Sequence, residues 1–189
     1  MKKLSVIAVL ALAALSSQAF AQVNSSLTLE GQSLQGRDGT LDAKSFDMTA
    51  RHNLNHALSG HVQASGSQTN RTNAVTTRLE AGLTGVVSLR GPFSGYTTVA
   101  VGEAFRSTGN FGFYSIEPGV RAALGAGLTA HVGYRYRAPF DSAVADTTST
   151  TRFGVSYALT KQDSVGVRYD RVMQNAKQDV IGVSYTRRF

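Results

Sequence analysis

The last ten residues of the chain read Val180–Ile181–Gly182–Val183–Ser184–Tyr185–Thr186–Arg187–Arg188–Phe189, and this stretch decides the fold. Successive side chains of a β-strand point to opposite faces, so a period of two separates these residues into two rows. One row is apolar except for one arginine and consists of Ile181, Val183, Tyr185, Arg187 and Phe189. The other row is mostly small or polar and consists of Val180, Gly182, Ser184, Thr186 and Arg188. The pattern predicts a strand whose two faces meet different solvents.

Phe189 ends both this predicted strand and the chain. Aromatic rings of membrane-spanning β-barrels gather where lipid meets water. Arg187 can reach the same level by extending its charged end into water. The ending resembles the C-terminal strand of bacterial outer-membrane β-barrels, in which a final Phe after alternating apolar residues is the assembly signal. This resemblance makes Tyr185 and Phe189 the expected assembly signal, and the barrel-assembly machinery an expected partner.

The first 21 residues have the organisation of a secretory signal peptide. Lys2 and Lys3 form a short basic region, residues 4–15 are almost wholly apolar, and Ala19–Phe20–Ala21 matches an A-x-A cleavage site. A transmembrane helix needs about 20 apolar residues, and this run is shorter. We therefore expect Sec-dependent export, cleavage near Ala21, and one mature domain over residues 22–189.

The rest of the chain contains ten segments of alternating polarity. They are Ser26–Leu34, Ser45–Leu54, Leu58–Ser65, Thr76–Leu89, Tyr96–Phe105, Phe113–Leu124, Leu128–Arg137, Thr151–Leu159, Ser164–Met173 and Val180–Phe189. Each is close to the length that a tilted strand needs to cross a bilayer. Glu103 breaks the pattern, since it shares a face with apolar residues and must lie above the hydrocarbon band or follow a bulge. Pro118 predicts a bulge or a local break in pairing.

The connections between these segments alternate in length. The odd ones are polar and mostly longer, and they are Gln35–Lys44, Gly66–Val75, Arg106–Gly112, Ala138–Ser149 and Gln174–Gln178. Most of the even ones are tight turns. Bacterial barrels combine short periplasmic turns with longer outer loops. We therefore predict an all-β, transmembrane, antiparallel up-and-down β-barrel of ten strands, with eight as the alternative, located in the bacterial outer membrane.

A soluble barrel would reverse the two faces, with the apolar row inside and the charged row outside. Periodicity alone cannot separate the two arrangements. The signal peptide, the terminal Phe and the loop asymmetry favour the membrane barrel, and a soluble periplasmic binding barrel remains the alternative.

In a membrane barrel the polar row lines the lumen. The predicted inward bases are Arg51, Arg78, Arg121, Arg135, Arg137, Arg152, Arg168 and Arg188, and the predicted inward acids are Glu30, Asp47, Glu80, Glu117 and Asp170. A lumen of eight to ten strands is barely wide enough for its own side chains. We expect these groups to pair across the lumen, because buried charges must be paired. A narrow, weakly anion-preferring pore is the functional alternative.

Catalysis and cofactor binding are not expected. All four histidines, His52, His56, His61 and His131, fall at or near the predicted periplasmic end. The first three straddle a predicted hairpin without the ligand spacing of a known metal site. The chain has no cysteine, so disulfides and thiolate metal sites are excluded. Asp141 and Asp146 are predicted to be solvated loop acids. We expect no enzyme activity, no cofactor and no metal.

The architecture resembles the small outer-membrane barrels that include OmpX-like and opacity-type proteins. That group implies structural, adhesive or host-contact roles carried by outer loops, although the loops here are short for an adhesin. Expected partners are outer-membrane lipid and lipopolysaccharide, whose phosphates would meet Arg71, Arg106 and Arg137. The bases are scattered singly at strand spacing without a Lys/Arg cluster, which argues against nucleic-acid binding. A monomer is expected.

Overall fold

The computed structural model describes residues 24–37, 42–70, 74–173 and 177–189. The predicted signal peptide and its cleavage site lie outside the described residues. None of the described residues belongs to a helix long and apolar enough to cross a membrane.

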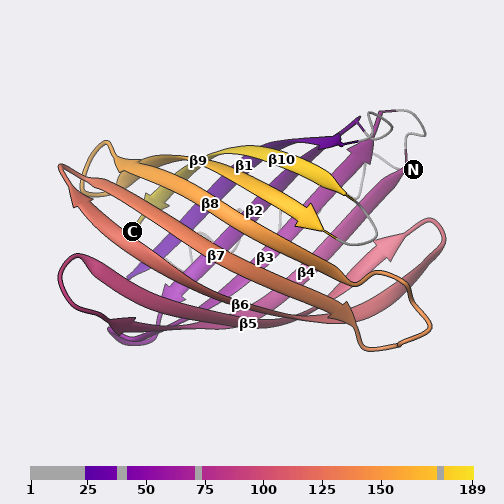
Figure 1. Cartoon of the computed structure of the whole chain (residues 1–189), viewed down its shortest axis with the longest axis horizontal. Coiled ribbons are helices and arrows are strands. Elements are labelled where there is room, and N and C mark those ends of the chain that lie inside the picture. The colour runs from indigo at the N-terminus through magenta and orange to yellow at the C-terminus, as the bar shows by residue number, and fades with distance from the viewer. Residues whose placement is uncertain (1–23, 38–41, 71–73, 174–176) are drawn as a thin grey trace.

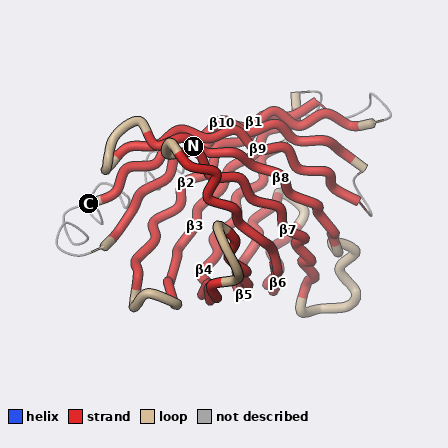
Figure 2. Tube along the Cα trace, turned by 60° about the vertical axis from the view of Figure 1, so that its left-hand side comes forward, coloured by secondary structure: helices blue, strands red, loops and turns tan. Residues whose placement is uncertain are grey.

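Every regular element of the described chain is a β-strand, as the red tube of Figure 2 shows. The strands are β1 (Ser25–Gly36), β2 (Asp42–Asn53), β3 (Leu58–Thr69), β4 (Val75–Ser88), β5 (Phe93–Arg106), β6 (Gly109–Gly125), β7 (Leu128–Pro139), β8 (Thr148–Ala158), β9 (Asp163–Met173) and β10 (Gln178–Arg188). Each pairs antiparallel with its neighbours in sequence, and β1 pairs with β10. The result is a closed ten-strand up-and-down barrel, so the ten-strand prediction is confirmed.

The strands cross the barrel obliquely (Figure 1). A circuit through the paired residues from Ser25 returns to β1 about 12 residues further along, at Arg37, whose N–H donates to the carbonyl of Lys177. Such a stagger accompanies a strand tilt of about 40°. It also means that residues far apart in sequence face one another at the same height in the lumen.

The two faces of the wall carry the side chains that the alternation predicts. Large apolar residues are exposed on the outside, and Val167, Ile181 and Val183 expose 57%, 58% and 61% of their surface. Charged residues such as Glu30 and Asp170 are buried inside. This distribution is the reverse of a soluble barrel, in which the interior is apolar.

The two predicted irregularities are resolved differently. Glu103 pairs in unbroken register with Leu79 and Gly112, so no bulge precedes it; its exposed side chain lies on the outer face, near the end of β5. Pro118 pairs with Thr97 of β5 but with no residue of β7, so the predicted break in pairing is confirmed. A proline lacks the N–H that would donate a ladder hydrogen bond to a neighbouring strand.

Both described ends of the chain lie at one end of the barrel, which we call the terminal end, together with the turns 54–57, 89–92, 126–127 and 159–162. The opposite end, called the loop end, carries the other connections. All of these were predicted too long, because the strands extend further toward this end than the alternation indicated. The difference is clear between β5 and β6, where β6 begins at Gly109 and only residues 107–108 separate the two strands. Gly109 has a φ of +136°, a conformation that glycine adopts without strain. The longest described connection, 140–147, joins β7 to β8.

Candidate functional site

Three ion pairs connect strands that are not neighbours in the wall. They join Arg135 of β7 to Glu80 of β4, Arg152 Nη1 of β8 to Glu117 Oε2 of β6 at 2.7 Å, and Arg168 Nη2 of β9 to Glu30 Oε1 of β1 at 2.9 Å. The predicted pairing of lumen charges is therefore present. These pairs lie inside the lumen at mid-height and join strands two or three positions apart in the wall. We call the residues involved, together with Asp170, the lumen network.

Asp170 joins two of these pairs. Its carboxylate lies 3.4 Å from Arg152 Nε and 3.2 Å from Arg168 Nε, and the residue is 4% exposed. Oδ1 of Asp170 and both Nε atoms are buried without a hydrogen bond, so the contacts are electrostatic rather than directional. Removing one member of such a set leaves an uncompensated buried charge.

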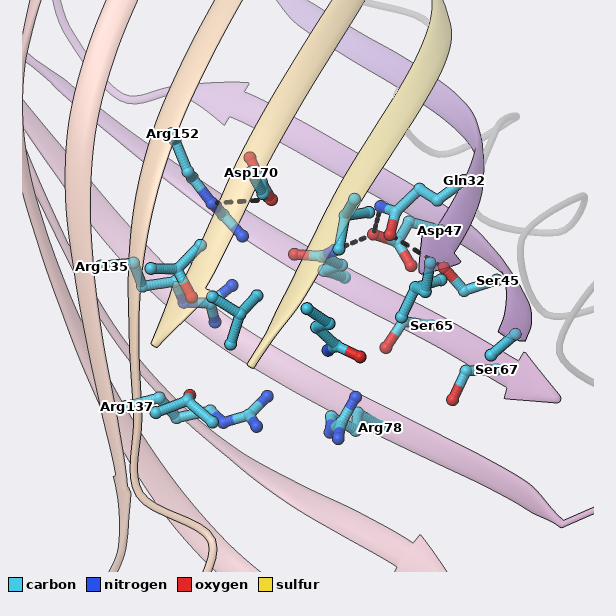
Figure 3. A pocket seen from close by; sticks show the side chains of 18 of the residues that line it. Gln32, Ser45, Asp47, Ser65, Ser67, Arg78, Arg135, Arg137, Arg152 and Asp170 are labelled. Carbon is cyan, nitrogen blue, oxygen red and sulfur yellow. Dashed lines mark hydrogen bonds and ion pairs between the residues drawn. The ribbon is translucent and has the colours of Figure 1, made fainter. Parts of the chain in front are cut away.

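Asp47 lies beside the lumen network but is held by neutral groups. Gln32 Nε2 donates to Asp47 Oδ2 at 2.6 Å, Gln63 Nε2 donates to the same oxygen at 3.2 Å, and Ser45 Oγ donates to Gln32 Oε1 at 2.8 Å (Figure 3). No described cation lies within ion-pair distance of Asp47. The sequence pattern placed Asp47 in the lumen, but it carried no signal for the two glutamine amides.

A second charged layer lies nearer the loop end. Asp146, from the connection 140–147, accepts hydrogen bonds from Arg106 Nη2 at 2.6 Å and from Arg137 Nη2 at 3.3 Å. The prediction that Asp146 is a solvated loop acid is wrong, because the connection turns this carboxylate onto arginines of β5 and β7. Those two arginines bind Asp146, and their predicted contact with lipopolysaccharide stays a prediction. Arg71 lies outside the described residues.

Between these layers lies a polar cavity of about 250 Å³. Its lining includes Arg78, Arg137, Asp47 and hydroxyl-bearing side chains such as Ser65 and Thr150. Arg78 and Arg137 reach into it toward one another, and Asp47 lies on another side (Figure 3). The guanidinium of Arg137 also lies 5.5 Å from the ring centre of Phe113, which is 1% exposed.

Two predicted lumen bases lie apart from the lumen network, toward the terminal end. Arg51 Nη1 donates to Ser59 Oγ at 3.3 Å. The guanidinium of Arg121 lies 5.6 Å from the ring centre of Tyr96, and the residue is exposed at the rim.

The histidines also lie toward the terminal end. His52 Nδ1 is hydrogen-bonded to Ser25 Oγ at 2.9 Å, a contact that joins β1 to β2 and that sequence spacing did not indicate. His61 Nε2 lies 3.7 Å from Glu80 Oε1. Within the described ranges, no three His, Cys, Asp or Glu residues are grouped so that they could hold a metal ion.

The residues of the predicted assembly signal lie where the barrel closes. Tyr185 is exposed on the outer wall, and its hydroxyl donates to Asp163 Oδ1 at 2.6 Å. The N–H of Phe189 donates to the carbonyl of Ser25 at 2.9 Å, and its ring is 44% exposed. The assembly role itself stays a prediction.

Comparison with known proteins shows the fold. No family model and no curated protein matches the sequence. The chain is similar to the NanC porin, with a TM-score of 0.55 at 9% identity over 86% of this chain and 100% of that one. It is also similar to the KdgM porin in complex with disordered oligogalacturonate, with a TM-score of 0.51 at 12% identity over 87% and 99%.

A further match is a loop-deletion mutant of OmpT, an outer membrane protein of Vibrio cholerae, with a TM-score of 0.45 at 13% identity over 78% of this chain. The chain spans only 54% of the length of that protein. The likeness to NanC and KdgM, together with the apolar outer wall, shows that this chain has the fold of a small outer-membrane β-barrel.

Proposed function

We propose that the protein is a monomeric barrel of the bacterial outer membrane whose lumen is closed at mid-height by the lumen network. Its role is structural or surface-interacting, with outer-membrane lipid and lipopolysaccharide around the wall. The observation that carries this proposal is the set of three ion pairs inside the lumen between strands two or three positions apart in the wall.

Electrostatics favours a closed bore. Each network side chain is mostly withdrawn from water; Arg135 and Glu80 expose 14% and 8% of their side chains. Separating a buried ion pair without a replacement partner costs about 3–5 kcal/mol. An ion that crosses the bore must displace such pairs, so permeation is expected to be rare.

Residence in the outer membrane is supported by the outer wall. Its side chains are mostly Leu, Val, Phe and Tyr, which lower the free energy of the barrel when lipid covers them. Export through a signal peptide at residues 1–21 completes this proposal. Heat-modifiable mobility of the protein in outer-membrane fractions, and an N-terminal sequence that begins at Gln22, are the expected findings.

We further propose that the barrel is not an enzyme. Among the described residues, the side-chain hydrogen bond between a serine and a histidine joins Ser25 to His52. Ser25 is 4% exposed, which closes its hydroxyl to a substrate. Nucleophilic catalysis needs an accessible hydroxyl beside its base. Hydrolysis of peptide or lipid A that is lost in His52→Ala or His131→Ala would overturn this proposal.

Planar-bilayer conductance tests closure. The wild type is expected to give no stable channels, and Glu80→Gln/Arg135→Gln, which removes one pair without changing the net charge, is expected to give discrete openings. The matched control is Arg37→Gln/Asp179→Asn, which removes a pair with a 3.3 Å contact outside the lumen network. Stable wild-type channels that the first double variant leaves unchanged would contradict closure.

A narrow, weakly anion-preferring pore is the second candidate. Arg78, Arg106 and Arg137 at the loop end favour it, and so does the likeness in fold to two porins. If this candidate is correct, the wild type forms channels that prefer anions, and the channels of Arg78→Gln lack that preference.

A further inference from the structure

Charge is segregated along the lumen. The loop-end layer holds Arg78, Arg106 and Arg137 but one described carboxylate, Asp146. The middle layer has the opposite bias: three arginines of the lumen network share it with five carboxylates, those of Glu30, Asp47, Glu80, Glu117 and Asp170. The loop-end layer therefore carries two positive charges that its own acid does not balance.

Arg78 carries one of these unbalanced charges. It forms no hydrogen bond and no ion pair with any residue that the structure describes, and its Nε is buried without a partner. Arg78 as a whole is partly exposed, but a buried donor such as its Nε is normally paired, because the lost hydration must be replaced. Among the described lumen arginines of the middle and loop-end layers, Arg78 alone lacks a protein partner.

Arg137 carries the second unbalanced charge. It shares Asp146 with Arg106, and Arg106 has the shorter contact, 2.6 Å against 3.3 Å. Nε of Arg137 is also buried without a hydrogen bond. Two guanidinium groups with free donors thus face one another across the cavity (Figure 3).

We propose that Arg78 and Arg137 form a binding site for a small dianionic oxyanion of the phosphate or sulfate type. The guanidinium group presents planar pairs of N–H donors that match the oxygens of such anions. A dianion balances the two surplus charges, and hydroxyl groups of Ser65, Ser67 and Thr150 line the same cavity. The carboxylates of the middle layer repel the anion, and this repulsion keeps the anion on the loop-end side of the cavity.

The site is independent of whether the barrel conducts, because binding needs access only from the loop end. It also differs from a selectivity filter for anions, since the acid-rich layer below it opposes further passage. Binding can therefore be tested in detergent micelles, without a membrane potential and without any assumption about permeation.

Isothermal titration calorimetry of the detergent-purified protein with inorganic phosphate, in chloride-free buffer, tests the proposal. The wild type is expected to bind one phosphate saturably, with sulfate competing and acetate competing at least about tenfold more weakly because it balances one charge. Arg78→Gln is expected to weaken phosphate binding by at least about tenfold, because the substitution removes charge-assisted hydrogen bonds to the anion. Each variant is first checked for heat-modifiable gel mobility and a β-type circular dichroism spectrum.

Arg51→Gln is the matched control, because it removes the same charge from the lumen on the terminal side, where Arg51 contacts Ser59. It is expected to leave phosphate binding within about twofold. Asp146→Asn is a second variant that leaves both proposed donor residues in place, and it is expected to tighten binding because it removes the carboxylate that competes for Arg137. Absence of saturable binding to the wild type, equal losses in Arg78→Gln and Arg51→Gln, or weaker binding in Asp146→Asn would each overturn the proposal.

Discussion

Replacing Arg152 by Met is expected to destabilise the barrel by about 3–5 kcal/mol, the cost of breaking a buried ion pair from one side. The side chain of Arg152 is 18% exposed and contacts Glu117 at 2.7 Å and Asp170 at 3.4 Å. After the substitution Asp170 keeps Arg168 at 3.2 Å, but Glu117 keeps only the hydroxyl of Tyr96, at 3.3 Å. The cost comes mainly from the Glu117 carboxylate, which is left buried without a cation.

Urea unfolding in phospholipid vesicles measures this cost. Circular dichroism is the suitable probe, because the chain contains no Trp. With a denaturant slope of about 2 kcal/mol per molar urea, the midpoint is expected to fall by about 2 M. The matched control is Arg187→Met, which removes a 3.6 Å contact to Asp163 from a side chain that is 51% exposed. Such an exposed surface pair contributes little to stability.

A combined variant separates lost pairing from lost packing. Arg152→Met/Glu117→Met removes the orphaned acid as well, and it is expected to recover most of the stability, since an apolar replacement of a whole buried pair is often neutral. Equal midpoint shifts in Arg152→Met and Arg187→Met, or no recovery in the combined variant, would refute the conclusion that the lumen network is a buried electrostatic unit.

Three shorter predictions concern the wall. Val167→Arg is expected to lower the free energy of unfolding in vesicles by about 2–4 kcal/mol, because Val167 faces lipid at mid-strand. A shift in the urea midpoint that corresponds to less than about 1 kcal/mol would indicate that position 167 faces water instead. Gly133→Val is expected to lower the free energy of unfolding by about 1–3 kcal/mol in the same assay, because a Cβ at Gly133 would lie 2.5 Å from the Tyr96 hydroxyl. The matched control is Gly66→Val, whose Cβ would enter open space and is not expected to clash. Phe189→Ala is expected to lower the amount of heat-modifiable protein in outer-membrane fractions without changing total expression, and equal amounts would remove the assembly role.

The alternation of side chains was enough to predict the strands and their two faces. A strand between lipid and a polar lumen imposes a period of two over its whole length, so segments such as Leu128–Arg137 were located within two residues of β7. Pro118 was also informative, because a proline removes a ladder hydrogen bond wherever it falls. Glu103 was ambiguous, since one charge on an apolar row fits either a bulge or a position near a strand end.

Contacts across the lumen could not be predicted. They depend on the stagger of the barrel, and alternation within a strand contains no information about it. The period of two places Arg135 and Glu80 inside, but only the closed register brings β7 and β4 face to face at one height. Asp146 was missed for a related reason: it belongs to a connection without periodicity, and its role depends on how that connection turns toward Arg106 and Arg137.

Spin-label accessibility along β9 tests most directly whether apolar side chains face lipid while charged ones face a closed lumen. The chain has no cysteine, so single substitutions to Cys at successive positions from 165 to 172 can each carry one nitroxide in vesicles. Labels at Val165, Val167 and Tyr169 are expected to collide strongly with dissolved oxygen and weakly with a water-soluble nickel chelate, whereas labels at Gly166 and Arg168 are expected to show little collision with oxygen. An oxygen profile without a period of two, or one with its maxima at Gly166 and Arg168, would contradict this arrangement.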